Sequence, residues 1–85
     1  MDRSALAEAT ARKAAEHGGQ VSADDVGRVL EALFGTVTEA GTLAEALRRD
    51  QAVSLMGFGS FHVEDGTAVL RPGQALTEYL NGDVG

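Results

Sequence analysis

The chain has 85 residues and no cysteine, so it is one small domain without a disulfide, a cysteine nucleophile or a cysteine metal ligand. Its 13 Asp and Glu outnumber 7 Lys and Arg, and the formal net charge of −6 opposes long-range attraction to nucleic acid. No apolar run approaches the roughly 20 residues that span a bilayer, and the polar N-terminus is unlike a signal peptide, so we expect a cytoplasmic protein without membrane contact.

The first predicted helix has Ser4 as its expected N-cap and is rich in alanine, which combines high helix propensity with a small side chain. It ends in the segment 17–20, where Gly18 is the expected C′ residue. A second helix is expected to begin after Ser22. Two aspartates, Asp24 and Asp25, lie in its first turn, where the helix dipole favours negative charge.

Apolar side chains of this second helix recur at alternating spacings of four and three residues, which is the pattern of a heptad seam. The pattern predicts one continuous helix from about Ser22 to Arg49. The alternative is a break at Gly41, after which Thr42 and Glu45 would form a new capping box. A chain this short cannot cover such a stripe by itself, so we expect a dimer rather than a monomer with an internal core helix. The expected interface residues are Val26, Leu30, Leu33, Phe34, Val37, Ala40, Ala44 and Leu47.

After Gln51 the apolar period changes to two, which is typical of strands. Segments 53–56 and 60–64 both alternate between apolar and polar positions. Asp65-Gly66 predicts a two-residue hairpin turn, and residues 67–70 are the expected return strand.

The last part of the chain predicts a short helix. Pro72-Gly73 breaks the return strand, and residues 74–80 form the expected helix. Asn81-Gly82 ends it, and residues 83–85 are expected to fray.

No catalytic constellation is present in the sequence. His17 and His62 are isolated and lack a metal-ligand spacing, and Asp24-Asp25 is better explained by helix capping than by acid–base chemistry. We therefore expect no enzyme activity, no metal, no cofactor and no small-molecule substrate.

The most informative motif is the stretch 55–61, Leu-Met-Gly-Phe-Gly-Ser-Phe, in which two glycines bracket an aromatic residue at a strand corner. With the segments 2–6, 22–25 and 71–76, it makes the chain similar to the bacterial histone-like family of HU and integration host factor. The resemblance implies an α+β fold with two N-terminal helices, a three-stranded antiparallel sheet and a short C-terminal helix. It also implies a single domain in an intertwined dimer. Residues 1–50 would be the helical dimerisation half, and residues 51–85 the saddle of strands with the last helix.

The resemblance further implies duplex DNA as a partner, because two β-arms of the family dimer embrace the minor groove and a proline at each arm tip bends the duplex. This sequence departs from the family in four respects. Asp65-Gly66 closes a tight hairpin where the arm would emerge, and Gln74 and Thr77 stand where the family presents lysines. The charge is acidic, and extra residues lie around positions 17–21 and 41–45.

Two functions follow as hypotheses. The first is an armless, nucleoid- or phage-associated homodimer that binds duplex DNA weakly, without sequence preference and with little bending. The second is an acidic module that pairs with or antagonises a basic HU-like protein, and a plainer third is a structural dimer within a larger assembly. The expected DNA contacts are Arg3, Gly57, Gly59, Arg71, Gly73 and Gln74, and Phe58 and Phe61 are expected to join the dimer interface. A competing interpretation of both arginines is that they are solvated surface charges. For the corner glycines, the competing interpretation is that only glycine fits the tight backbone geometry.

Overall fold

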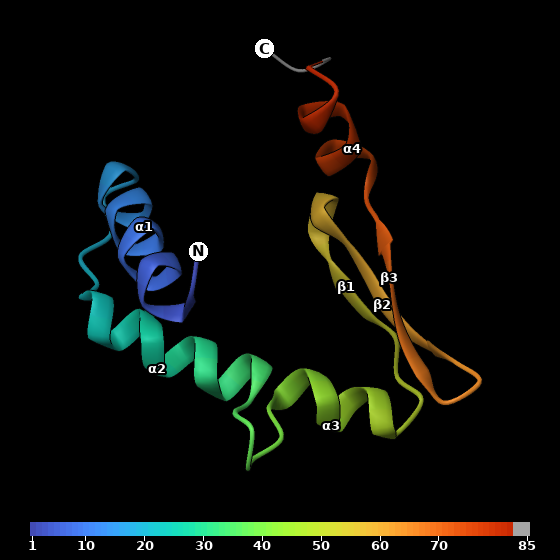
Figure 1. Cartoon of the computed structure of the whole chain (residues 1–85). Coiled ribbons are helices and arrows are strands. Elements are labelled where there is room, and N and C mark those ends of the chain that lie inside the picture. The colour runs from blue at the N-terminus through green and yellow to red at the C-terminus, as the bar shows by residue number, and fades with distance from the viewer. Residues whose placement is uncertain (83–85) are drawn as a thin grey trace. The chain divides into compact units, whose positions relative to one another are not determined.

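The computed structural model describes residues 1–82 and contains four α-helices and one three-stranded antiparallel sheet (Figure 1). The predicted α+β fold class is confirmed. Backbone contacts divide the chain into two compact units, residues 1–42 and the residues from 43 onward. No helix among residues 1–82 is long and apolar enough to cross a membrane. The expected fraying of residues 83–85 lies outside the described residues.

Helix α1 (Arg3–Glu16) begins at a different cap from the one predicted. The Oδ1 atom of Asp2 accepts a hydrogen bond from the Ala5 N–H at 2.9 Å, so Asp2 is the N-cap and the prediction of Ser4 was wrong. Asp and Ser are equally good caps, and only the backbone conformation selects between neighbours. The predicted end is confirmed, because Gly18 adopts φ 84° and the Gly19 N–H donates to the Ala14 carbonyl at 2.8 Å. This bond belongs to a Schellman motif.

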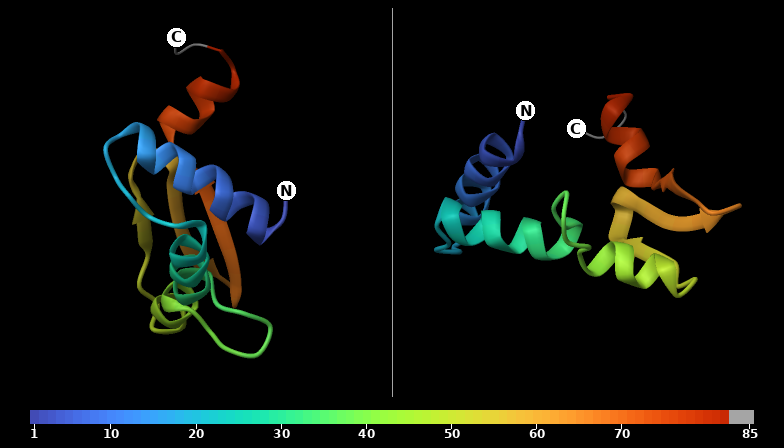
Figure 2. Two further views of the ribbon diagram at one scale, coloured as in Figure 1. Left: turned by 90° about the vertical axis from the view of Figure 1, so that its left-hand side faces the viewer. Right: turned by 60° about the horizontal axis from the view of Figure 1, so that its bottom comes forward.

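Helix α2 (Ala23–Phe34) packs against α1, as Figures 1 and 2 both show. Ser22 caps it as predicted, accepting the Asp25 N–H at 3.1 Å. The small side chain of Ala7 on α1 and that of Val26 on α2 are buried in this unit. The alanine-rich sequence of α1 therefore has the role that its composition indicates, which is to let a second helix approach closely.

The predicted continuous helix from Ser22 to Arg49 was wrong. Helix α2 ends at Phe34, a loop occupies residues 35–41, and α3 (Thr42–Arg48) is a separate element. Gly35 ends α2 with φ 85°, a conformation that favours glycine. The seam positions Val37 and Ala40 consequently lie in the loop and not on a helix.

The loop 35–41 is held by its own hydrogen bonds. Gly35 and Ala40 form an isolated β-bridge, and the Thr36 N–H donates to the Glu39 carbonyl at 2.8 Å. The Thr36 hydroxyl in turn accepts the Glu39 N–H at 3.2 Å. Gly41 comes so close to the end of α2 that an added Cβ would lie 2.6 Å from the Leu33 carbonyl oxygen. Two glycines and a threonine turn thus form a compact alternative to continued helix.

The sheet has the order β1-β2-β3, with β1 (Val53–Leu55), β2 (Gly59–Glu64) and β3 (Thr67–Pro72). The predicted hairpin turn is confirmed, because Glu64 pairs with Thr67 across Asp65-Gly66. Both turn residues have positive φ, 51° and 76°, as a type I′ turn requires. A 3₁₀ turn (Met56–Phe58) joins β1 to β2, and α4 (Gln74–Leu80) follows β3 with the predicted bounds (Figure 2).

Few apolar side chains are buried in the part of the chain that the structure describes. They are those of Ala7, Val26 and Leu43. Several large apolar side chains are instead more than half exposed, namely Met1, Val29, Phe34, Val37, Met56, Phe58, Tyr79 and Leu80.

Candidate nucleic-acid interface

Three glycines bring the strand corner and the start of α4 into contact. The Gly73 N–H donates to the Phe58 carbonyl at 2.9 Å. A Cβ on Gly57 would lie 2.7 Å from the Cβ of Ala75, and one on Gly73 would overlap the Gly57 carbonyl oxygen. The corner motif and the Arg71-Pro72-Gly73-Gln74 segment, which the sequence places far apart, therefore form one site.

Gly59 has two reasons to be glycine. Its φ is 152°, and an added Cβ would lie 2.6 Å from the Arg71 carbonyl oxygen. Close packing therefore requires glycine at positions 57, 59 and 73, whereas their expected contact with DNA stays a prediction.

One face of the sheet carries the polar side chains. Ser54 pairs with Ser60, and Ser60 pairs with Arg71, so these three residues form a row across the strands. His62 and Glu64 follow Ser60 on the same side of β2, and His62 Nε2 lies 3.4 Å from Glu64 Oε1. The opposite face carries the row formed by Val53, Phe61 and Leu70.

Arg71 and Gln74 differ in the polar contacts that their side chains make. Arg71 is exposed and has no ion pair within residues 1–82. The Gln74 side chain donates through Nε2 to Glu78 Oε1 at 2.8 Å. Arg71 is thus available to a phosphate, whereas Gln74 is bonded to a carboxylate that would repel one.

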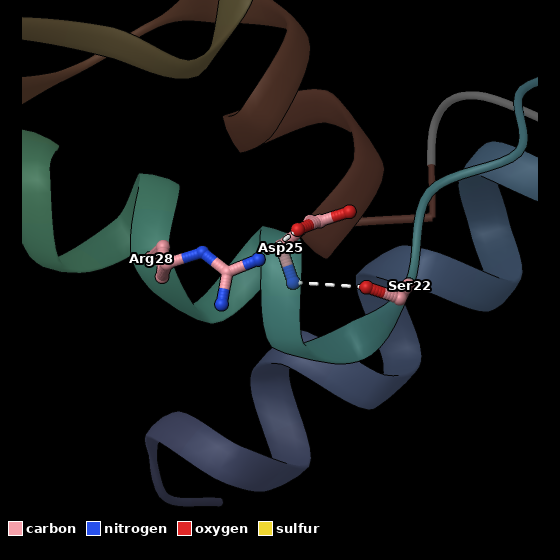
Figure 3. Close-up of polar contacts among 3 residues, drawn as sticks. All are labelled: Ser22, Asp25 and Arg28. Carbon is pink, nitrogen blue, oxygen red and sulfur yellow. Dashed lines mark hydrogen bonds and ion pairs between the residues drawn. The ribbon is translucent and has the colours of Figure 1, made fainter.

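Arg3 belongs to the other unit, at the contact between α1 and α2. Its guanidinium lies over Gly27, because a Cβ there would be 2.6 Å from Arg3 Nη1. Arg3 lines a cavity of about 280 Å³ together with Glu8, Asp24 and Arg28. Arg28 also forms an exposed ion pair with Asp25, the residue whose N–H Ser22 caps (Figure 3). Charges of both signs therefore surround Arg3.

The expected interface residues are found in three environments. Val26 is already buried by α1. Leu30, Leu33, Leu47 and Phe61 are half-buried. The exposed members are Phe34, Val37, Ala40, Ala44 and Phe58, and the Val37 side chain is fully exposed. Ala44 and Leu47 line a groove of about 390 Å³ with Val63 and Ala68 of the hairpin.

Met56 was not among the predicted site residues, yet it is unusual in two respects. Its backbone has φ 52° and its side chain is 93% exposed. A left-handed methionine has no sequence signature, because glycine and asparagine are the residues that normally mark such positions. Among residues 1–82, no group of three or more His, Asp or Glu side chains could hold a metal ion.

Of the comparisons with known proteins, the one with solved structures agrees with this architecture. No protein-family profile and no curated protein matches the chain. Among solved structures, the chain is similar to a mutant of HU from Thermotoga maritima, with a TM-score of 0.74 and 28% sequence identity. The match covers 94% of this chain and 99% of the HU chain. The resemblance predicted from the corner motif is confirmed, and with it the expectation of a non-enzymatic protein. The chain has the HU-like, histone-like fold.

Proposed function

We propose that the chain is a nucleoid-associated histone-like homodimer that binds duplex DNA weakly, without sequence preference and with little bending. The HU-like fold over 94% of the chain is the observation that carries this proposal. The exposed and unpaired Arg71 on the polar face of the sheet supplies a phosphate contact.

Dimerisation is proposed because neither unit covers its own apolar side chains. Phe34 in the first unit is 55% exposed, and Phe58 in the second is 51% exposed. Burial of a phenylalanine side chain contributes about 1.5–3 kcal/mol. Both side chains are already about half-buried, so covering each with a second copy of the chain would contribute about half of that free energy, and each residue occurs twice in a dimer.

Weak binding follows from the charges. Between residues 51 and 82, Arg71 is the only Lys or Arg, against Glu64, Asp65 and Glu78. Little bending follows from the two-residue turn of the hairpin, which leaves no arm to reach around the duplex. Four phosphate contacts, from Arg3 and Arg71 of two copies, would give a log–log salt slope of about −3.6.

The alternative function is an acidic protein-interaction module. The Gln74–Glu78 hydrogen bond supports it, because it places a carboxylate beside the start of α4. Such a surface would attract a basic HU-like protein and repel DNA.

Fluorescence anisotropy of a labelled duplex of arbitrary sequence, titrated at low and then rising salt, tests the proposal. We expect micromolar binding that weakens with salt at the slope given above. The double variant Arg3→Glu/Arg71→Glu should lose most of the DNA affinity. The control variant Arg12→Glu/Arg49→Glu makes the same change in net charge at two exposed arginines outside the proposed contacts. It should lose much less DNA affinity.

Equal losses in the two double variants would show that only net charge matters and that the contact assignment is wrong. Absence of wild-type binding at low salt would overturn the DNA-binding proposal and favour the protein-interaction module. That module would then be tested by titrating the chain with a basic HU protein.

A further inference from the structure

A histidine and a glutamate lie side by side on the polar face of the sheet. His62 and Glu64 project from the same side of β2, because strand residues two positions apart share a face. His62 Nε2 lies 3.4 Å from Glu64 Oε1. The His62 side chain is 27% exposed and that of Glu64 is 62% exposed, so both respond to the pH of the solvent and to a ligand on this face.

The strand pairing defines which other side chains share this face with the pair. They are those of Ser54, Ser60, Thr67, Val69 and Arg71. Arg71 is a diagonal neighbour of His62, because it lies two residues beyond Val69, the residue opposite His62 on β3. With a neutral histidine, the charged side chains at these strand positions are Glu64 and Arg71, and their charges cancel.

Charged groups on the neighbouring elements of this unit also contribute to the local field. Arg48 and Asp50 line the groove with Val63 and Ala68, which belong to the opposite face of the hairpin. Helix α4, which carries Glu78, packs against the 3₁₀ turn. The charged residues of these elements are Glu45, Arg48, Arg49 and Asp50 in or after α3, Asp65 in the hairpin turn and Glu78 on α4. Carboxylates and guanidinium groups ordinarily keep their charge between about pH 6 and 8, whereas histidine changes its charge there.

We propose that His62 makes the DNA affinity of the chain depend on pH, because its protonation offsets the charge of Glu64 beside Arg71. The added charge would lie 3.4 Å from the Glu64 carboxylate. It would change the strand positions of this face from a net charge of zero, Arg71 against Glu64, to +1. A phosphate that approaches Arg71 would then meet less repulsion. This inference rests on the proposed DNA-binding function and adds regulation by protons to it.

The anisotropy assay on the full chain, run at about pH 6.0 and about pH 7.5 at one low ionic strength, tests the inference. We expect wild type to bind about tenfold more tightly at the lower pH. An added charge about 4 Å from a phosphate contributes roughly fivefold in water before salt screening, and it occurs twice in the proposed dimer.

The chain offers a matched control, because its other histidine lies in the other unit. His62→Gln removes the titrating ring and should reduce the difference between the two pH values to less than about twofold. His17→Gln changes the exposed C-cap of α1 and should keep the wild-type difference. The α-amino group, which also titrates near neutral pH, is common to wild type and both variants. A comparison between them therefore isolates the imidazole of His62.

Glu64→Gln tests the role of the carboxylate separately. Because it removes the negative charge at every pH, it should tighten binding at pH 7.5 by about fivefold. Its position is exposed, so this variant decides the question even if His62→Gln does not fold, which circular dichroism would show. Unchanged affinity of Glu64→Gln at pH 7.5 would overturn the inference.

The outcomes separate the inference from the function on which it rests. If wild type binds the duplex equally at both pH values, or if His62→Gln keeps the full pH dependence, the inference is wrong and the DNA-binding function stands. If sedimentation shows that the pH dependence follows a change between monomer and dimer, the inference is also wrong. If wild type binds DNA at neither pH, the proposed function fails and the inference fails with it.

Discussion

At the scale of single residues, Gly73 beside the strand corner and Gly66 in the hairpin turn show two separable constraints. Gly73 has an ordinary φ of −79° but no room for a Cβ, because the Gly57 carbonyl occupies that space. Gly66 has φ 76° but no heavy atom within 4 Å of an added Cβ. One position is fixed by contact and the other by backbone conformation.

Alanine at these two positions should therefore have different effects on stability. We expect Gly73→Ala to lower the free energy of unfolding by about 3 kcal/mol, because backbone must move to admit the methyl group. Gly66→Ala should cost only about 1–2 kcal/mol, the price of a left-handed alanine. Urea unfolding followed by circular dichroism measures both. Equal costs would mean that the corner does not pack against α4 as described.

The sequence predicted much at this scale and missed one residue. Gly18, Ser22 and Asp65-Gly66 have the roles that their chemistry indicates, because caps and turns are determined by a few neighbouring residues. Ser4 failed as a cap because Asp2 is an equally good acceptor two positions earlier. Met56 could not be foreseen, since nothing in a methionine indicates positive φ.

At the scale of elements, the loop 35–41 is the main departure from expectation. The heptad spacing continues through Val37, Ala40 and Ala44, although two of these residues lie in a loop. Periodicity reports where apolar residues recur and does not report the space around a backbone. The close approach of Gly41 to the Leu33 carbonyl is a contact across the loop, and the spacing of apolar residues does not encode it.

The variant Gly41→Ala distinguishes the loop from a continuous helix by the sign of its effect. In a helix interior, alanine would stabilise by about 1 kcal/mol relative to glycine. In the loop, the new Cβ would lie 2.6 Å from the Leu33 carbonyl oxygen, and we expect a loss of about 1–3 kcal/mol. Thermal unfolding provides the measurement. A gain in stability accompanied by increased helical circular dichroism would favour the continuous helix.

At the scale of the whole molecule, the exposed apolar side chains form the surface that the proposed dimer would cover. Val29 on α2 is 61% exposed, and its neighbours Leu30 and Leu33 are half-buried. The sequence predicts a dimer from the shortness of the chain and from its apolar stripe together, and the dimer stays a prediction. It could not give the arrangement of the partner, which depends on surfaces from both copies.

The proposed dimerisation would make stability depend on concentration. We expect the unfolding temperature to rise with protein concentration, since association stabilises the folded state by mass action. Val29→Glu should shift sedimentation from dimer to monomer and remove that dependence, whereas Thr10→Glu, an equal charge change on the exposed side of α1, should leave both unchanged. If Val29→Glu unfolds at the wild-type temperature at every concentration, α2 does not lie in the interface.

The tip of the β2–β3 hairpin is open, so residues could be added to the hairpin or removed from it there. Glu64 and Thr67 close the ladder, and a Cβ added to Gly66 beyond them would meet no heavy atom within 4 Å. Residues added at this point would extend two paired strands outward without disturbing a buried contact, and lengthening a loop adds only about 0.6 kcal/mol for each doubling. The length of this hairpin can therefore be changed at one turn, while the pairing of the rest of the sheet is kept.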